Sequence, residues 1–255
     1  MFEDLKGKVV LITGASTGIG AAAARAFGAC GARVAVHYNA SRDAAEAVAA
    51  DVRRAGGESA LVAGDVTLAA TPKAVVDAVV KAFGRLDILV NNAGGLVKRT
   101  PVAEYSDELL DQVIALNIRQ VVSFVREATL QIRRQGGGGN IVNVSSIAAR
   151  HGGGPGSVIY AATKGFVSTA TRGWARELVG DRIRVNAVSP GVILTPFHER
   201  YSTPELLKAM QATVPMNRLG EADECSGAFL FLASDSMSGY VTGQIIEING
   251  GQLMP

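Results

Sequence analysis

The chain has 255 residues, of which 48% are hydrophobic and 19% are charged, with a formal net charge of +2. This composition excludes a disordered chain, and the balanced charge without long basic runs excludes an electrostatic footprint for nucleic acid. The two cysteines and three widely separated histidines form neither a disulfide framework nor a metal-ligand pattern. No apolar run approaches the ~18 residues of a membrane span, and the acidic N-terminus does not resemble a signal peptide. We therefore expect a cytoplasmic protein that binds no metal, membrane or nucleic acid.

Strand-like and helix-like runs alternate along the whole chain. The strand-like runs lie at residues 8–13, 33–37, 59–63, 86–90, 141–144, 183–188 and 244–248. The main helical runs lie at 21–29, 42–54, 71–83, 106–135, 157–179 and 221–233, with short helical segments at 196–201 and 204–213. Several strands are continuous apolar runs, which indicates a parallel sheet covered on both faces. We predict an α/β protein with one domain, residues 1–255, and a small insertion at about 194–217.

A glycine-rich turn follows the first strand and precedes the first helix. It runs from Gly14 through Ser16 and Thr17 to Gly18, Ile19 and Gly20. The glycines permit a tight turn with close backbone approach, and the N-terminus of the following helix offers free N–H groups to a phosphate. The spacing Gly-x-x-x-Gly-x-Gly differs from the usual dinucleotide-binding pattern. We predict a nucleotide-binding turn, and the alternative is a loop without a ligand.

The end of the second strand bears on the choice of cofactor. A unit that binds NAD usually has an acidic residue there, which holds the ribose hydroxyls. This chain has Tyr38 and Asn39, followed by Ser41 and Arg42, which both suit a 2′-phosphate. The sequence therefore favours NADP, with NAD possible. The alternative is that Ser41 only caps the helix at 42–54 and that Arg42 is solvated.

The residues with the clearest chemistry follow the strand at 141–144. Ser146 lies directly after that strand, a Gly/Pro loop expected to contain no helix comes next, and Tyr160 and Lys164 then lie four residues apart on one helix face. A free tyrosine ionises near pH ~10, and a neighbouring ammonium lowers that pKa. A hydroxyl such as that of Ser146 could hold a carbonyl oxygen while the phenol protonates it. The alternative is a surface pair of Tyr and Lys.

Polar residues at several strand ends point to one cleft. Gly14, Asp65, Asn92, Ser146 and Pro190 each follow the carboxyl end of a strand, which is the edge where ligands bind to open parallel sheets. Asn117, in contrast, interrupts the apolar face of the helical run at 106–135. A buried Asn must satisfy its amide group, so it indicates either a structural hydrogen bond or a kink with a catalytic role.

Taken together, these motifs resemble the short-chain dehydrogenase/reductase family over essentially the whole chain. The motifs are Thr13-Gly14-x-x-x-Gly18-Ile19-Gly20, Asn91-Asn92-Ala93-Gly94, Asn117, Ser146, Tyr160-x-x-x-Lys164 and Pro190-Gly191. The resemblance implies a Rossmann-like domain with strand order 3-2-1-4-5-6-7. It also implies hydride transfer between the nicotinamide C4 and a carbonyl or alcohol carbon. Members are commonly homotetramers, which would use the helices at 106–135 and 157–179 for one interface and the C-terminal helix and strand for another.

The resemblance also implies a role for each motif residue. Tyr160 would be the general acid or base, Lys164 would lower the Tyr160 pKa and bind the nicotinamide ribose, and Ser146 would bind the substrate oxygen. Asn117 would hold Lys164 through a water molecule. The implied cofactor contacts are Gly14, Ser16, Thr17, Gly18, Ile19 and Gly20 at the pyrophosphate, Asp65 and Val66 at the adenine, and Asn92, Ala93, Gly94, Pro190, Gly191, Ile193 and Thr195 around the nicotinamide half. The interval of 14 between Ser146 and Tyr160 is one longer than usual, so we expect the pocket wall to differ there.

Three stretches, at 95–99, 147–159 and 194–214, are expected to form the substrate pocket. Their charged residues and histidines are Lys98, Arg99, Arg150, His151, His198, Glu199 and Arg200. One hypothesis is reduction of a 3-oxoacyl thioester, with Arg or Lys steering an acidic carrier. A second is oxidation of a sugar or polyol. A third, from another class, is an NADP-binding sensor without turnover, against which the complete set of motif residues argues. Any single one of these charges could also be a rim residue without a role.

Overall fold

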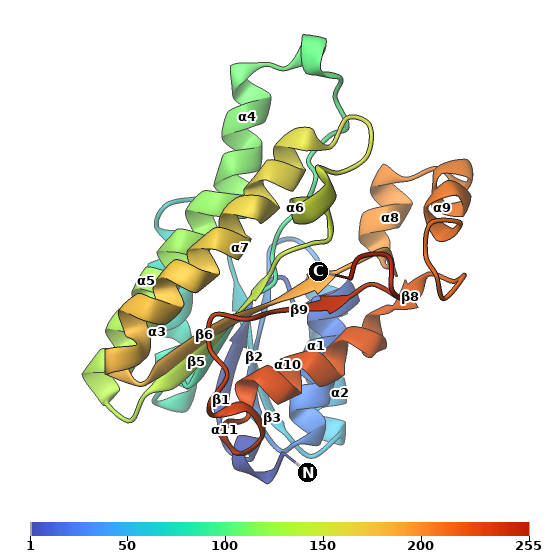
Figure 1. Ribbon diagram of the computed structural model, residues 1–255. Coiled ribbons are helices and arrows are strands. Elements are labelled where there is room, and N and C mark those ends of the chain that lie inside the picture. Colours follow the sequence, from blue (N-terminus) through green and yellow to red (C-terminus); the bar gives the residue numbers. More distant parts are fainter. Residues whose placement is uncertain (1, 255) are drawn as a thin grey trace.

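Seven parallel strands form the centre of the protein in a computed structural model that describes residues 2–254 (Figure 1). Their spatial order is β3-β2-β1-β4-β5-β6-β9, which confirms the predicted α/β class and strand order. The strands are β1 (Val9–Ile12), β2 (Arg33–Tyr38), β3 (Glu58–Ala63), β4 (Ile88–Asn91), β5 (Gly139–Val144), β6 (Ile183–Pro190) and β9 (Ile245–Ile248). The last strand is β9 because two short strands, β7 (Ile193–Leu194) and β8 (Gly220–Glu221), pair separately.

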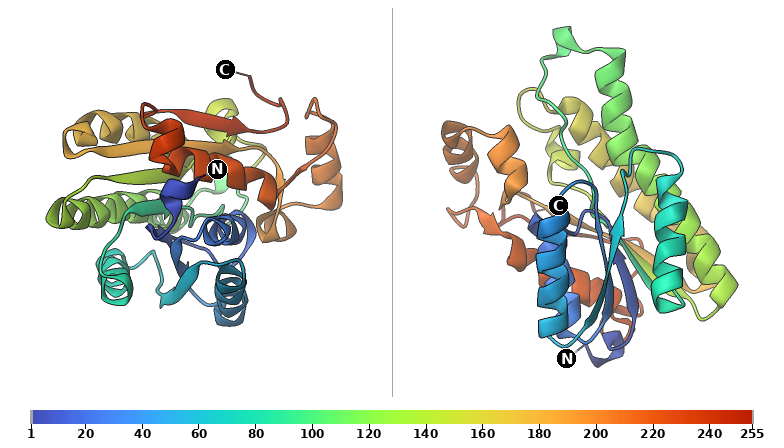
Figure 2. Two further views of the ribbon diagram at one scale, coloured as in Figure 1. Left: turned by 90° about the horizontal axis from the view of Figure 1, so that it is seen from below. Right: turned by 180° about the vertical axis from the view of Figure 1, so that it is seen from behind.

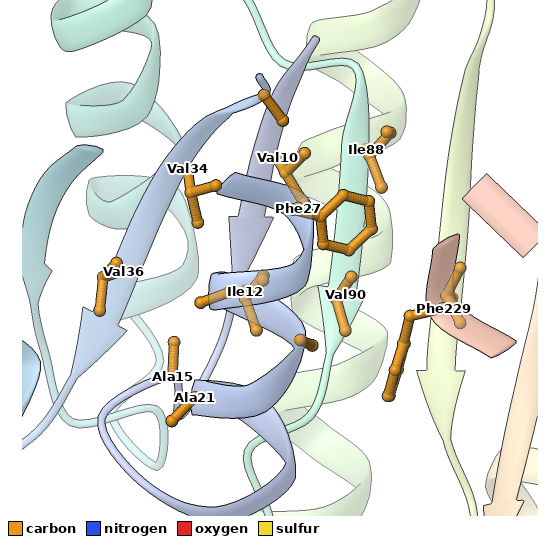
Figure 3. Packing of buried hydrophobic residues seen from close by; sticks show 14 of the residues in the cluster. Val10, Ile12, Ala15, Ala21, Phe27, Val34, Val36, Ile88, Val90 and Phe229 are labelled. Atoms are coloured by element: carbon orange, nitrogen blue, oxygen red, sulfur yellow. The ribbon is translucent and has the colours of Figure 1, made fainter. Parts of the chain in front are cut away.

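Helices cover both faces of the sheet, because successive residues of a strand point to opposite sides. Val10 and Ile12 pack on the side of α1 (Gly18–Ala29), α2 (Arg42–Arg54) and α10 (Ser226–Ala233), whereas Val9 and Leu11 face α3 (Thr71–Phe83), α5 (Gln120–Gln135) and α7 (Val158–Leu178). Figure 3 shows Phe27 of α1 beside strands β1 and β4. Its side chain is fully buried, so truncating it to alanine would cost about 3–5 kcal/mol.

The helices differ from the prediction in four places. The run at 106–135 is α4 (Asp107–Ile114) and α5, joined by a π-helical turn at Ala115–Arg119. The loop after Ser146 was expected to contain no helix, and this prediction was wrong, because α6 (Ala148–His151) forms there and ends at Gly152 with φ 81°. The last helical run begins with a 3-10 turn at Ala222–Cys225 before α10. A further short helix, α11 (Asp235–Ser238), follows it.

The carboxyl ends of the parallel strands lie at one edge of the sheet, and several short helices stand beside that edge. They are α6, α8 (Pro196–Tyr201) and α9 (Pro204–Gln211). Figures 1 and 2 show α8 and α9 on one side of this edge and α4 on the other. This arrangement places the loops that carry the candidate residues around a common space.

Candidate active site

A cleft of about 860 Å³ opens at the carboxyl edge of the sheet, a size typical of small-molecule sites. It brings together most of the predicted residues, from seven separate segments of the chain. Those that line it are Gly14, Ser16, Thr17, Gly18, Ile19, Asn39, Ser41, Asp65, Val66, Asn92, Ala93, Gly94, Ser146, Tyr160, Lys164, Pro190, Gly191, Ile193 and Thr195. The predicted residues that do not line it are Gly20, Tyr38, Arg42 and Asn117.

The glycine turn lies directly against the chain that leaves β4. Gly14 has φ 63°, and a Cβ atom added there would lie 3.1 Å from the Ala93 Cα. The Asn92 amide Nδ2 donates to the carbonyl oxygens of Thr13 and Gly14, both at 2.9 Å. A Cβ on Gly20 would overlap Asn92 Nδ2, so Gly20 permits this packing and does not itself reach the cleft.

Helix α1 presents its N-terminus to the cleft without a side chain that would satisfy it. Its N-cap residue Thr17 makes no side-chain capping bond, and the first turn contains no acidic residue. The first amide groups of a helix need a partner from outside the helix, and the N-terminal dipole favours an anion. Gly18 and Ile19 line the cleft at this point, so the residues fit the pyrophosphate of a dinucleotide.

His37 is a residue of this site that the sequence analysis missed. It is 1% exposed, its Nδ1 accepts the Gly14 N–H at 3.1 Å, and its carbonyl oxygen accepts the Ala15 N–H at 2.7 Å. Burial lowers the His37 pKa to about 4, against a smaller opposing effect of the Gly64 backbone, so the ring is neutral at pH 7. The expected strand order could have pointed to His37, because β2 lies beside β1 and the carboxyl ends of the two strands meet.

The four residues predicted to select the cofactor divide into two pairs. Asn39 and Ser41 line the cleft, and Ser41 makes no side-chain bond to α2, which contradicts the alternative that it only caps that helix. Arg42 instead forms an exposed ion pair with Glu46 at 2.8 Å, and Tyr38 is 8% exposed within the core. Neither of these last two residues lines the cleft, and their contact with a cofactor stays a prediction.

Ser146, Tyr160 and Lys164 lie together at the other end of the cleft. Lys164 is 5% exposed, its Nζ donates to the Val144 carbonyl oxygen at 2.8 Å, and it lies 5.7 Å from the centre of the Tyr160 ring. The alternative of a solvated surface pair is therefore wrong. The neighbouring Ser145 is buried and bonds to Ser168 at 2.7 Å, so Ser145 anchors α7. The Ser146 hydroxyl instead accepts the Ala148 N–H at 3.1 Å and acts on the pKa of Tyr160.

The pKa of the phenol is shifted opposite to the expected direction. Burial raises the pKa of Tyr160 to about 12, although the hydrogen bond with Ser146 acts the other way. Burial also lowers the pKa of Lys164 to about 8. Desolvation is therefore the larger effect on the phenol, and the Lys164 ammonium donates to the Val144 carbonyl oxygen. A phenol with this pKa is protonated at neutral pH and is therefore a proton donor.

Asn117 lies in the π-helical turn, so the kink expected at this residue is present. Its Oδ1 accepts the Gly95 N–H at 3.0 Å, and its Nδ2 donates to the Gly95 and Val113 carbonyl oxygens at 2.9 and 3.0 Å. The observed bonds are structural. They fix the loop after β4, where a Cβ on Gly94 would lie 2.9 Å from Asn117 Oδ1 and 3.3 Å from Lys164 Nζ.

The substrate end of the cleft combines cationic and aromatic side chains. Of the charged residues and histidines named above, Arg99, His151, His198 and Arg200 line it, and Lys98, Arg150 and Glu199 do not. The sequence analysis missed Phe197 and Tyr201, whose rings lie 5.0 Å apart, with Phe197 5.8 Å from Tyr160. Phe197 and Tyr201 lie four residues apart in the segment that begins at Pro196. This spacing could have revealed them, because it places both on one face of a short helix.

Residues 2–254 contain neither a side-chain cluster suited to a metal ion nor a helix suited to span a membrane. No group of three or more His, Cys, Asp or Glu side chains there could hold a metal ion. No helix in the same range is both long and apolar enough to cross a membrane.

The fold and the cleft define an oxidoreductase with a nicotinamide cofactor that acts on an alcohol or carbonyl group, and comparison with known proteins gives its family. A family model described as enoyl-(acyl carrier protein) reductase matches residues 14–252. The chain is 38% identical over 247 residues to a 3-oxoacyl-[acyl-carrier-protein] reductase of Staphylococcus aureus, with 97% of this chain and 98% of the relative covered. It belongs to the short-chain dehydrogenase/reductase family.

Solved structures agree with this assignment. A short-chain type dehydrogenase/reductase from Mycobacterium marinum has a TM-score of 0.93 and 34% identity, with 100% of this chain and 98% of that chain covered. An NADH-dependent reductase A1-R′ complexed with NAD has a TM-score of 0.90 and 36% identity, with 100% of each chain covered. The same reductase is described elsewhere as responsible for alginate metabolism.

Proposed function

We propose that this protein reduces a carbonyl compound to an alcohol with NADPH, with Tyr160 as the proton donor. The observation that carries the proposal is one cleft that holds the α1 N-terminus at one end and Ser146, Tyr160 and Lys164 at the other. The nicotinamide, when bound, supplies the hydride. Ser146 would hold the carbonyl oxygen, Tyr160 would protonate it, Lys164 would bind the ribose hydroxyls, and Asn117 would hold Lys164 through water.

The protonation state of Tyr160 suits proton donation in the reductive direction. Its raised pKa of about 12 keeps the phenol protonated at neutral pH, which suits donation to a developing alkoxide. In the oxidative direction the same group would first have to lose its proton against that pKa. We therefore expect faster turnover in the reductive direction at pH 7, measured by the change in NADPH absorbance with ketone or with alcohol.

The preference for NADP over NAD rests on Asn39 and Ser41. No acidic residue follows β2 in the cleft lining, and the Ser41 hydroxyl is free of any capping bond. An acidic side chain at this position would repel a 2′-phosphate and bind ribose hydroxyls. Ser41→Asp should therefore reduce kcat/KM with NADPH at least about tenfold while sparing NADH. Equal use of both cofactors by the wild type would remove this part of the proposal.

The first substrate class we propose is a 3-oxoacyl thioester. It is supported by the identity to 3-oxoacyl-[acyl-carrier-protein] reductases over nearly the whole chain. The test is the decay of NADPH absorbance with acetoacetyl-CoA, for the wild type and Tyr160→Phe. Turnover that the mutant loses would support the proposal. An NADP-binding sensor without turnover would keep its function in Tyr160→Phe.

A second candidate is a sugar or polyol substrate. The arginines and histidines at the substrate end of the cleft favour it, since they suit a polar molecule better than an acyl chain. A neighbour of known structure is an NADH-dependent reductase responsible for alginate metabolism. A panel of aldoses, uronates and polyols, assayed with NADP and NAD, distinguishes this candidate from the thioester.

We also propose that the whole chain acts as one catalytic domain and assembles as a homotetramer. The segment at 194–217 would act as the substrate loop. Val122 and Leu130 on α5 and Phe166 on α7 are exposed apolar side chains on the helices expected at one interface. Light scattering of the purified protein tests this, and a monomer would contradict it.

A further inference from the structure

Arg99 links the three walls of the substrate end of the cleft. Its Nε donates to the Tyr201 carbonyl oxygen in α8 at 2.7 Å, and its Nη1 donates to the Pro155 carbonyl oxygen in the glycine loop at 2.9 Å. It follows Val97, whose φ of 66° is unusual for a β-branched residue. The Thr100 N–H donates to the Gly156 carbonyl oxygen at 3.0 Å, which also fixes this segment. The guanidinium therefore has a defined position in the lining.

The charge of Arg99 is not neutralised by the protein. Within residues 2–254, every ion pair involves other residues, and both hydrogen-bond acceptors of Arg99 are neutral carbonyl groups. Its Nη2 group makes no hydrogen bond to the described residues. Burial also lowers the Arg99 pKa from its ordinary value, although an arginine remains charged at neutral pH. A partly desolvated cation without a counter-ion is unfavourable unless a ligand provides the anion.

The remaining charges of the cleft lining have the same sign at this end. Arg200, an exposed residue of α8, is the second cation there. The only acidic residue in the lining is Asp65, which follows β3, and one of its oxygens accepts the Thr67 N–H and hydroxyl at 2.9 and 2.7 Å. Asp65 therefore lies with the cofactor residues and does not pair with the arginines. The pyrophosphate of a cofactor does not account for Arg99 either, because the α1 N-terminus is the site that fits it.

We propose that the substrate carries an anionic oxygen group, a carboxylate or a phosphate, on the same molecule as the carbonyl, and that Arg99 binds this group. The inference rests on the carbonyl reduction proposed above and adds the chemical class of the substrate. The planar guanidinium suits both anions, because its parallel N–H groups match their paired oxygens. Arg200 would add a weaker, solvent-screened attraction at the rim.

Two matched pairs of substrates test the charge separately from the shape of the pocket. Acetoacetate and ethyl acetoacetate share one ketone and differ in a carboxylate. Acetoacetyl-4′-phosphopantetheine and acetoacetyl-pantetheine share one thioester and differ in one phosphate. The quantity measured is the ratio of kcat/KM for the anionic member to kcat/KM for the neutral member, with NADPH and with NADH.

Arg99→Gln should lower this ratio at least about tenfold for one of the pairs, and that pair identifies a carboxylate or a phosphate as the anion. Arg99→Lys, which keeps the charge but not the paired N–H groups, should lower the ratio less than Arg99→Gln does. The matched control is Arg150→Gln, since Arg150 is exposed and does not line the cleft, and its ratio should be unchanged.

The proposal is refuted if Arg99→Gln lowers kcat/KM for both members of each pair equally. That result would mean that Arg99 only holds the three walls together. A wild type that prefers the neutral members of both pairs would refute it as well. A wild type that turns over neither these four compounds nor any aldose or uronate of the panel, with either cofactor, would instead refute the proposed carbonyl reduction, and this inference with it.

Discussion

Replacing the buried His37 should change how the stability of this protein depends on pH. The folded-state pKa is about 4, compared with 6.5 for a free histidine, because the ring is desolvated. Between these two values the unfolded chain binds a proton that the folded chain does not. The free energy of unfolding therefore falls as the pH decreases through this window, and the full stability is present above 6.5. The difference between the two pKa values corresponds to about 3 kcal/mol in the free energy of unfolding, of which about 2 kcal/mol is already lost at pH 5.

Protonation also has a structural consequence at the glycine turn. Since Nδ1 accepts the Gly14 N–H, the neutral ring carries its proton on Nε2, and a second proton would have to occupy Nδ1. In protonated His37, the Nδ1–H donor would then face the Gly14 N–H, which is also a donor. We therefore expect the dissociation constant of NADPH to rise over the same acidic range in which stability is lost.

The assay is urea unfolding at fixed protein concentration, at several pH values between 5 and 7.5, for the wild type and His37→Asn. The Asn Oδ1 can still accept the Gly14 N–H, but the smaller side chain leaves a gap and should cost about 1–2 kcal/mol at pH 7.5. The variant should then lose about 2 kcal/mol less than the wild type on going to pH 5. His151→Asn, at an exposed histidine, should leave the wild-type dependence unchanged. Parallel curves for the wild type and His37→Asn would refute the reasoning.

Four further substitutions have clear expected outcomes. Tyr160→Phe should lower kcat by about 10²–10⁴-fold with unchanged NADPH affinity, measured by fluorescence titration, and a mutant within tenfold of wild type would remove Tyr160 as the proton donor. Lys164→Met should abolish activity yet raise the free energy of unfolding at pH 7 by up to about 3 kcal/mol, because the folded-state pKa of about 8 reflects a buried charge. In the wild type, the destabilisation by this buried charge should decrease as the pH rises from 8 to 10.5. A Lys164→Met variant less stable than the wild type at pH 7 would contradict this reasoning. Gly20→Ala should cost about 1–3 kcal/mol and weaken NADPH binding because the new methyl group overlaps Asn92, whereas Gly173→Ala, with open space around it, should stabilise α7 by about 0.5–1 kcal/mol.

Features that depend on neighbouring residues could be predicted from the sequence. The apolar runs gave the strands, because a strand buried on both faces needs apolar residues at every position. The interval of four between Tyr160 and Lys164 placed both on one face of α7, and the glycine turn could be recognised from its position between β1 and α1. The seven-stranded sheet was confirmed in the expected order. The chemical roles of these residues remain predictions.

Contacts between distant segments could be found only in the folded chain. Gly14 and His37 are 23 residues apart, and Arg99 and Tyr201 are 102 residues apart. The pair of Arg42 and Glu46, in contrast, joins residues four apart on one helix and is of a kind that the sequence pattern can predict. Periodicity reports which face of an element is buried, whereas the partner that a polar side chain finds depends on which elements the fold places next to it. Burial also reversed the expected direction of the Tyr160 pKa, because desolvation comes from the whole surrounding structure and not from the neighbouring residue in the helix.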